Sequence, residues 1–179
     1  DFVYMANQHR FHAWLTSFTV RHIDALMADC HRDVNLARQY GFANKKPFLV
    51  LPGNGGVDLS TFKPGVPASQ RESWVIYPRS LAPYIRLDTF MNSMVLLQKD
   101  PDFFNIRYKL LITPAVIPLV EFMAQKHNVD MSKIDILPFM FKNDLANLLQ
   151  RAMVMISPSL TDGTPNSMLE AMACGVFPV

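Results

Sequence analysis

The sequence predicts an α/β protein in which helices cover both faces of a parallel β-sheet. Short β-type apolar runs alternate with helical patterns and recur roughly every 20 to 35 residues, which is typical of βαβ units. Half of the 179 residues are hydrophobic, so the chain can fill a core and a disordered chain is excluded. No internal repeat or low-complexity segment interrupts the alternation.

The first part of the chain predicts a smaller set of elements. A helical stretch at 8–20 precedes an apolar run at 25–30 that predicts a short strand. Residues 32–40 predict a helix, and Gly41 is expected to end it as a C-terminal cap. The apolar run 47–52 predicts a buried strand.

Two connecting segments follow that strand. Gly53–Asp58 contains three glycines and predicts a loop with positive φ angles. Residues 59–73 contain prolines, glycine and polar residues, and they predict a linker.

From residue 74 the alternation is regular. The predicted strands are 74–78, 108–113, 134–138, 153–157 and 176–179. The predicted helices, with apolar residues at helical spacing, are 88–99, 116–127, 143–152 and 165–174. Ligands of such sheets bind at the carboxyl ends of the strands, so the residues just after each strand are the candidates for a site.

The composition excludes several functions. Seventeen basic against fifteen acidic residues leave a net charge of +2, too balanced for a nucleic-acid binder that relies on bulk charge. No apolar run reaches the roughly 18 residues of a transmembrane helix. Cys30 and Cys174 are too few for a disulfide framework and too far apart for a zinc pair, so buried free thiols are expected. His9 and His12 lack a Cys, Asp or Glu to complete a set, so no metal site is expected.

The segment 157–179 is the strongest signal for a ligand site. A predicted strand ends at Ser157, and Thr164 and Pro165 predict the N-cap and the first position of a helix. The free N–H groups and the dipole of a helix N-terminus favour a phosphate. Gly163 lets the backbone approach a ligand closely.

Two carboxylates flank this phosphate seat. Asp162 precedes it, and Glu170 lies about one and a half turns inside the helix. Carboxylates accept hydrogen bonds from hydroxyls, so the pair suits a ligand with hydroxyls on both sides of its phosphates, such as a nucleotide sugar. Taken singly, Asp162 could be a turn residue and Glu170 an ordinary helix acid.

The same segment resembles the donor-site motif of the retaining GT-B glycosyltransferases of family 4 type. That motif has an acidic residue, seven intervening residues and a glutamate that opens an E-A-M-A-C-G sequence, and Asp162 and Glu170 have this spacing. Gly55–Asp58, followed by Phe62, resembles the family's segment that leads into its second domain. Arg79 resembles the arginine of the family's G-R-L motif.

The resemblance implies a two-domain GT-B fold. Residues 1–58 would be the end of the N-terminal, acceptor domain, and 59–73 the interdomain linker. Residues 74–179 would be a Rossmann-like domain that binds a nucleotide sugar and is incomplete at its end. The chain begins at Asp1 without methionine and stops in an apolar run, so we expect a fragment that is inactive alone.

The resemblance also implies roles for single residues. Asp162 would bind the donor sugar and Arg79 would stabilise the departing diphosphate, and these two are the catalytic candidates. Glu170 would bind the ribose, and backbone near 138–140 would lie close to the base. The remaining donor-binding candidates are Gly163, Thr164, Pro165, Asn166, Ser167 and Arg86.

Two departures bear on these roles. Asp162 stands where the family usually has glutamate, and its carboxylate reaches one methylene less far. The family's lysine is out of register, and Arg86 is the nearest replacement for its charge.

The activity implied is transfer of a hexose from a nucleotide diphosphate sugar, with retention, to an unidentified glycan, lipid or small-molecule acceptor. No metal or other cofactor is expected, since arginines and a helix end supply the positive charge. A cytoplasmic location is expected, and peripheral contact with a membrane is compatible with this expectation. The alternatives are a non-catalytic nucleotide-sugar-binding or degenerate protein and a nucleotide-sugar epimerase of the same architecture.

Overall fold

The computed structural model describes residues 6, 9–78, 85–160 and 162–179. The chain divides into two compact units. The first consists of Asp1–Val57 with Thr161–Leu169, and the second of Asp58–Leu160 with Glu170–Val179.

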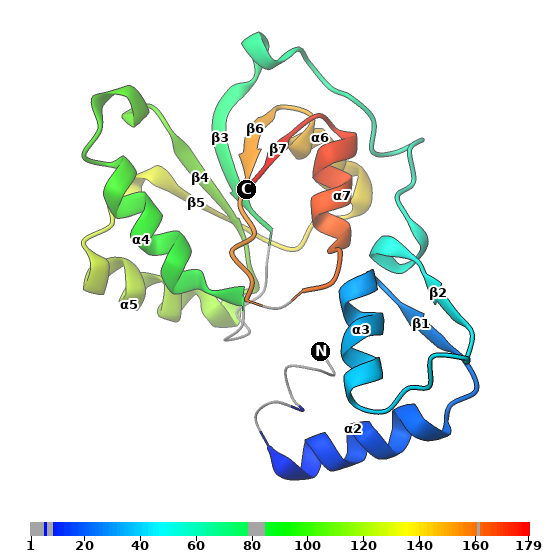
Figure 1. Ribbon diagram of the computed structural model, residues 1–179. Helices are drawn as coiled ribbons and strands as arrows, with labels where there is room; N and C mark the ends of the chain where they lie inside the picture. Colours follow the sequence, from blue (N-terminus) through cyan, green and yellow to red (C-terminus); the bar gives the residue numbers. More distant parts are fainter. Residues whose placement is uncertain (1–5, 7–8, 79–84, 161) are drawn as a thin grey trace. The chain divides into compact units, whose positions relative to one another are not determined.

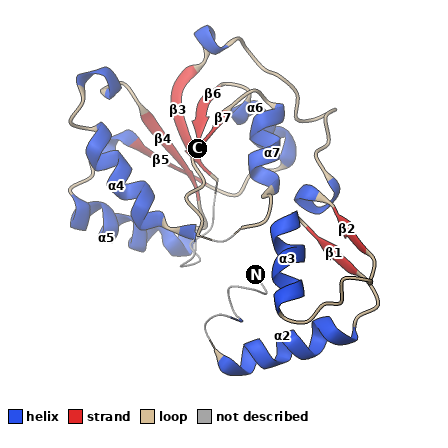
Figure 2. Cartoon of the chain, viewed as in Figure 1, coloured by secondary structure: helices blue, strands red, loops and turns tan. Residues whose placement is uncertain are grey.

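The second unit contains a parallel five-stranded sheet (Figure 2). Its strands in spatial order are β5 (Ile134–Leu137), β4 (Arg107–Leu111), β3 (Glu72–Tyr77), β6 (Ala152–Met155) and β7 (Phe177–Pro178). β3, the first strand of this sheet along the chain, is therefore the middle strand. β4 and β5 extend the sheet on one side of β3, and the chain then crosses back to add β6 and β7 on the other side. This is the strand order of a doubly wound, Rossmann-like sheet, and it confirms the predicted fold class.

Helices cover both faces of this sheet, as predicted (Figure 1). α4 (Leu87–Leu97) and α5 (Ile117–His127) connect the strands of the first half and lie on one face. α6 (Lys142–Leu149) and α7 (Asn166–Ala173) lie on the other. The change of face follows from right-handed crossovers, because the chain reverses its direction across the sheet after β5.

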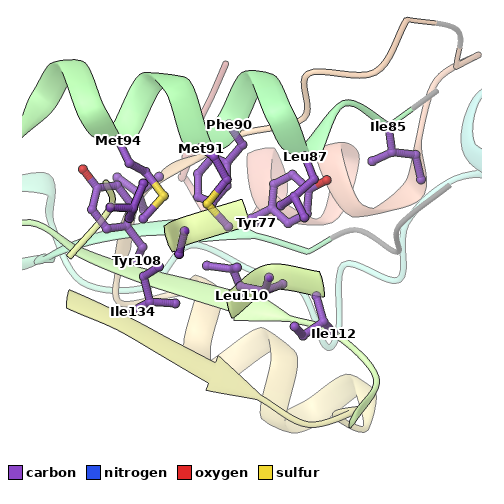
Figure 3. Packing of buried hydrophobic residues seen from close by; sticks show 14 residues of the cluster. Tyr77, Ile85, Leu87, Phe90, Met91, Met94, Tyr108, Leu110, Ile112 and Ile134 are labelled. Carbon is purple, nitrogen blue, oxygen red and sulfur yellow. The ribbon is translucent and has the colours of Figure 1, made fainter. Parts of the chain in front are cut away.

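The core explains why β3 is central. Val75, Ile76 and Tyr77 are consecutive and all buried, as expected for a strand that is covered on both faces. Phe90 of α4 packs with Tyr77 of β3 and with Tyr108 of β4, and Figure 3 shows the three side chains in one buried cluster. The Tyr77 and Phe90 rings are stacked with centroids 4.7 Å apart, and the Phe90 and Tyr108 rings meet edge to face.

The first unit has a two-stranded parallel sheet of β1 (Leu26–Ala28) and β2 (Phe48–Val50). α2 (Arg10–His22) precedes β1, and α3 (His31–Gln39) connects the two strands. Gly41 follows α3 with a φ of 109°, which confirms the predicted glycine cap. The glycines of the predicted loop after β2 also have positive φ angles.

The structure corrects several predicted boundaries. β3 begins at Glu72, inside the predicted linker, and Ala152 belongs to β6 and not to the preceding helix. Cys174 is a buried free thiol as expected, whereas the free thiol of Cys30 is only half-buried. Among the described residues, no helix combines the length and the apolar character needed to cross a membrane.

Candidate functional site

The strand order places the site at the junction of β3 and β6. These strands are neighbours, and the chain leaves them toward opposite halves of the sheet, which is the position where ligands bind in this class of fold. The loops that follow them contain the catalytic candidates of the sequence. Arg79 lies outside the described residues, so its role stays a prediction.

The loop after β6 begins as an extension of the sheet. The Ile156 amide donates to the Ile76 carbonyl at 2.9 Å, and the Ser157 amide donates to the Val179 carbonyl at 2.9 Å. Ser159 follows with a hydroxyl oxygen that is shielded from solvent and has no hydrogen-bond partner among the described residues. A buried hydroxyl without a partner is unfavourable by about 1–3 kcal/mol, which makes Ser159 a candidate for contact with a ligand.

The next residues pack against the loop after β1, within the first unit. Arg32 Nη2 donates a hydrogen bond to the Asp162 carbonyl oxygen at 2.7 Å. The Thr164 hydroxyl donates to the Asp29 carbonyl oxygen at 3.5 Å, a weak contact. Asp29 and Arg32 therefore hold the backbone on both sides of Gly163.

Two glycines allow this close packing. A Cβ at Gly163 would lie 2.6 Å from the Asp29 Cβ and 2.8 Å from its Oδ2 atom. Gly53, after β2, has a φ of 58°, and a Cβ there would lie 2.4 Å from Asn166 Oδ1 and 2.7 Å from Leu169 Cδ1. The sequence predicted that Gly163 admits a ligand, and the structure shows that its open side admits Asp29.

The start of α7 differs from the prediction. The helix begins at Asn166, and the amides of Met168 and Leu169 donate to the Pro165 carbonyl at 3.0 and 3.3 Å. Pro165 thus occupies the N-cap position, and Thr164, predicted as the cap, precedes it. The Thr164 hydroxyl is directed to the Asp29 carbonyl oxygen instead of to the first turn of the helix.

Glu170 lies on α7, in the second unit, and is half-buried. Burial raises the pKa of its carboxyl, and the positive charge of Lys142, at the start of α6, opposes this rise. No described residue forms a hydrogen bond or ion pair with this carboxylate. A half-buried carboxylate without a donor is suited to bind the hydroxyls of a ligand.

Arg86 precedes α4 in a left-handed conformation, with a φ of 56°. Its Nε and Nη2 atoms donate to the two oxygens of Asp88, both at 2.8 Å. The hydrogen bond from Arg86 lowers the pKa of the Asp88 carboxyl. To bind a phosphate, as the sequence suggests, Arg86 would have to use its other N–H groups or leave Asp88.

The sequence reasoning missed four residues of this region: Asp29, Arg32, Lys142 and Ser159. Asp29 comes one residue after β1, so the principle that sites follow strands could have identified it. Ser159 lies in the loop after β6, so the same principle could have identified it. Arg32 and Lys142 have no local signal, because only the folded chain brings Arg32 to this loop and Lys142 to α7.

The family is shown by a match over much of the chain. Residues 73–179 match the family of glycosyl transferases group 1. The chain belongs to this family. The match covers the five-stranded sheet except Glu72, the first residue of β3, and it includes the loop with Asp162 and the helix with Glu170.

Several known proteins are similar to this group 1 chain. It is 24% identical over 178 residues to UDP-Gal:alpha-D-GlcNAc-diphosphoundecaprenol alpha-1,3-galactosyltransferase of Escherichia coli, covering 91% of this chain and 44% of that protein. A sucrose-phosphate synthase from Thermosynechococcus elongatus has a similar fold, with a TM-score of 0.76 and 18% identity. The match covers 97% of this chain and 44% of the synthase. Anabaena HepE, solved in complex with UDP and glucose, matches with a TM-score of 0.75 and 13% identity. The match covers 99% of this chain and 50% of HepE.

These likenesses support the GT-B fold. The chain spans half or less of the length of each of these three proteins.

Proposed function

We propose that the longer protein is a retaining glycosyltransferase, and that residues 74–179 bind its nucleoside diphosphate sugar. The observation that carries this proposal is Glu170, a half-buried carboxylate without a donor partner, on the helix that follows the junction of β3 and β6. Membership of the group 1 family supports the reaction class. The Escherichia coli relative is a galactosyltransferase that uses UDP-Gal, and HepE has been solved with UDP and glucose.

The proposed roles follow the path of the donor. Glu170 accepts hydrogen bonds from the ribose hydroxyls, and Asp162 accepts them from the transferred hexose. Arg79 and the backbone N–H groups of the segment 163–167, among which Pro165 has none, stabilise the diphosphate. No described residue accepts a hydrogen bond from the amides of Gly163 and Asn166, which supports their use by a ligand.

The proposed reaction exchanges one bond at the anomeric carbon. The bond to the diphosphate oxygen breaks and the diphosphate leaves with the electron pair. The acceptor oxygen bonds to the same face of the sugar, and its proton passes to the diphosphate product. Positive charge fixed beside the leaving group supplies most of the rate enhancement, because it is worth more in a site without water than in solution. We propose that no metal is needed for this step.

We further propose that residues 1–58 belong to the acceptor half and that 59–71, the segment before β3, connect the halves. The relative's acceptor is a diphosphoundecaprenol-linked sugar, so a lipid-linked sugar is the first acceptor class to test.

The test is a calorimetric titration of the longest folded protein with UDP, GDP and ADP. Glu170→Ala is expected to weaken binding of the preferred diphosphate by more than tenfold, about 1.4 kcal/mol. Glu121→Ala removes an exposed acid on α5, at the opposite face of the sheet, and should leave binding unchanged. No binding by the folded wild-type protein would overturn the proposal in favour of a degenerate family member. Transfer of a labelled hexose from the donor to an acceptor would exclude the epimerase alternative.

A further inference from the structure

Arg32 connects the first turn of α3 to the backbone of the segment that contains Asp162. Its Nη2 atom donates to the Asp162 carbonyl oxygen at 2.7 Å, and both residues belong to the first unit. A hydrogen bond from a charged donor is stronger than one between two neutral groups. The bond therefore fixes the main chain of a residue to which we assign contact with the transferred hexose.

The guanidinium of Arg32 is itself held in place. Its Nε and Nη2 atoms both donate to Asp33 Oδ1, at 3.3 and 3.2 Å. The Arg32 side chain is 50% exposed, so this ion pair contributes little to the stability of the fold. What the pair does is restrict the directions in which Nη2 can point, and one of the bonds so oriented is the one to Asp162.

Two other loops restrict the residues that follow Asp162. A Cβ at Gly163 would lie 2.6 Å from the Asp29 Cβ, and a Cβ at Gly53 would lie 2.4 Å from Asn166 Oδ1. The segment 162–166 is thus packed closely against the loops after β1 and β2 within the first unit. Arg32 adds a polar bond at the beginning of this packed segment.

We propose that Arg32 is a positioning residue for the transferred hexose, which acts by holding the main chain of Asp162. This inference rests on the proposed function, since it takes the Asp162 carboxylate as the partner of the hexose hydroxyls. Aspartate has one side-chain torsion fewer than glutamate, so it has less freedom to compensate for a shift of its backbone. A misplacement of about 1 Å can lower a rate by about 100-fold. Asp162 therefore needs a fixed main chain more than a glutamate would.

This role predicts which ligands Arg32 affects. A nucleoside diphosphate has no hexose, so its binding should not depend on where the Asp162 carboxylate lies. If the Arg32 cation instead bound the diphosphate directly, or if it only stabilised the fold, its loss would weaken the diphosphate as well.

The experiment uses the full-length protein and the diphosphate preferred in the titration above. It measures Kd of that diphosphate and kcat for hexose transfer from its galactose and glucose conjugates to water, which yields free hexose and diphosphate and needs no acceptor. Arg32→Ala is expected to lower kcat by about tenfold or more and to leave Kd of the diphosphate within about twofold of wild type. Arg32→Lys should retain more of kcat than Arg32→Ala, because an ammonium can still donate to the Asp162 carbonyl.

Arg10→Ala is the matched control, because it removes the same charge from an exposed position on α2 of the first unit. It should change neither kcat nor Kd. The Arg32 side chain is half in solvent, so its variants should fold like the wild type, which melting curves would verify.

A longer side chain at residue 162 gives a second test. In Arg32→Ala/Asp162→Glu, the extra torsion should let the carboxylate reach the hexose from a displaced backbone, so kcat should exceed that of Arg32→Ala. A residue with a purely structural role would give no such coupling between the two changes.

The outcomes separate the inference from the proposed function. Wild-type kcat in Arg32→Ala, or no gain in the double variant, would reject the positioning role while the donor site stands. Weakening of the diphosphate in proportion to kcat would reject it too. If the wild-type protein neither binds a diphosphate nor transfers a hexose, the inference and the proposed function both fail.

Discussion

The two ends of the five-stranded sheet differ in how their polar groups are satisfied. At the amino ends, Asp135 of β5 accepts hydrogen bonds from Arg107 at 2.5 Å and Lys109 at 2.7 Å. Trp74 of β3 lies between two cations, with Lys109 Nζ 4.3 Å and Arg151 Cζ 4.8 Å from its ring centroid. Arg151 also donates to Glu72 at 2.7 Å, so the charges of this end form one connected network.

The carboxyl ends show the opposite pattern. Glu170 is half-buried without a donor, the Ser159 hydroxyl is buried without a partner, and Phe139 is in solvent. Both ends belong to the same five strands, so a difference in stability between separate sheets does not explain the contrast. Arg86 and Asp88 are paired at this end, but Glu170 and Ser159 are left unsatisfied at the end where parallel sheets bind ligands.

The largest expected effect breaks the packing around the carboxyl-end loop. Gly163→Ala places a Cβ 2.6 Å from that of Asp29, and the loop must move. Overpacking of this kind is unfavourable by about 1–3 kcal/mol, so we expect kcat/KM to fall by up to about 100-fold. Removal of the opposing side chain in Gly163→Ala/Asp29→Gly should restore part of the activity. Unchanged kinetics in the single variant would show that the loop has room for the methyl group.

The next effect tests the amino end. Trp74→Ala removes a half-buried ring and two cation–π contacts, and the free energy of unfolding should fall by about 2 kcal/mol. Urea denaturation would measure this loss, with Trp14→Ala as control because Trp14 is 61% exposed on α2. Donor affinity of Trp74→Ala should stay within twofold of wild type, and a larger loss would contradict the separation of the two ends.

A pH titration of stability should show the network of Asp135. The hydrogen bond from Arg107, helped by Lys109, lowers the pKa of the Asp135 carboxyl to about 2. A lowered folded-state pKa stabilises the protein above the unfolded value, and this contribution is lost as the pH falls from about 4 to about 2. It should be no more than about 2 kcal/mol. Asp135→Asn should remove this part of the acid sensitivity, and an identical acid profile in the variant would argue against the network.

The smallest expected effect is the pH dependence of stability caused by Glu170, which has the opposite sign to that of Asp135. Burial raises the pKa of its carboxyl, so the ionised form destabilises the fold as the pH rises through the folded-state pKa. Glu170→Gln should therefore be slightly more stable than wild type at pH 7, by less than about 0.5 kcal/mol. The difference should vanish at pH values below the unfolded-state pKa. Thermal melts at several pH values, without nucleotide, would detect it, and a less stable variant at pH 7 would contradict the assignment.

Much of the fold could be predicted because it depends on local patterns. Alternation of apolar runs and helical spacing located every strand and helix of the sheet to within a few residues. Gly41 marked the end of α3, since a glycine directly after helical spacing indicates a left-handed cap. The spacing of Asp162 and Glu170 also depends only on the chain, and their roles stay predictions that the experiments above address.

Tertiary structure decided the contacts that join distant segments. Arg32 and Asp162 are separated by 130 residues, and nothing local to either one indicates their hydrogen bond. The same holds for Asp29 beside Gly163 and for Lys142 near Glu170. Periodicity and capping act within a few residues and can be read from the sequence. The partner of a side chain, its burial and its pKa depend on which loops the strand order brings together, and that is settled only when the chain folds.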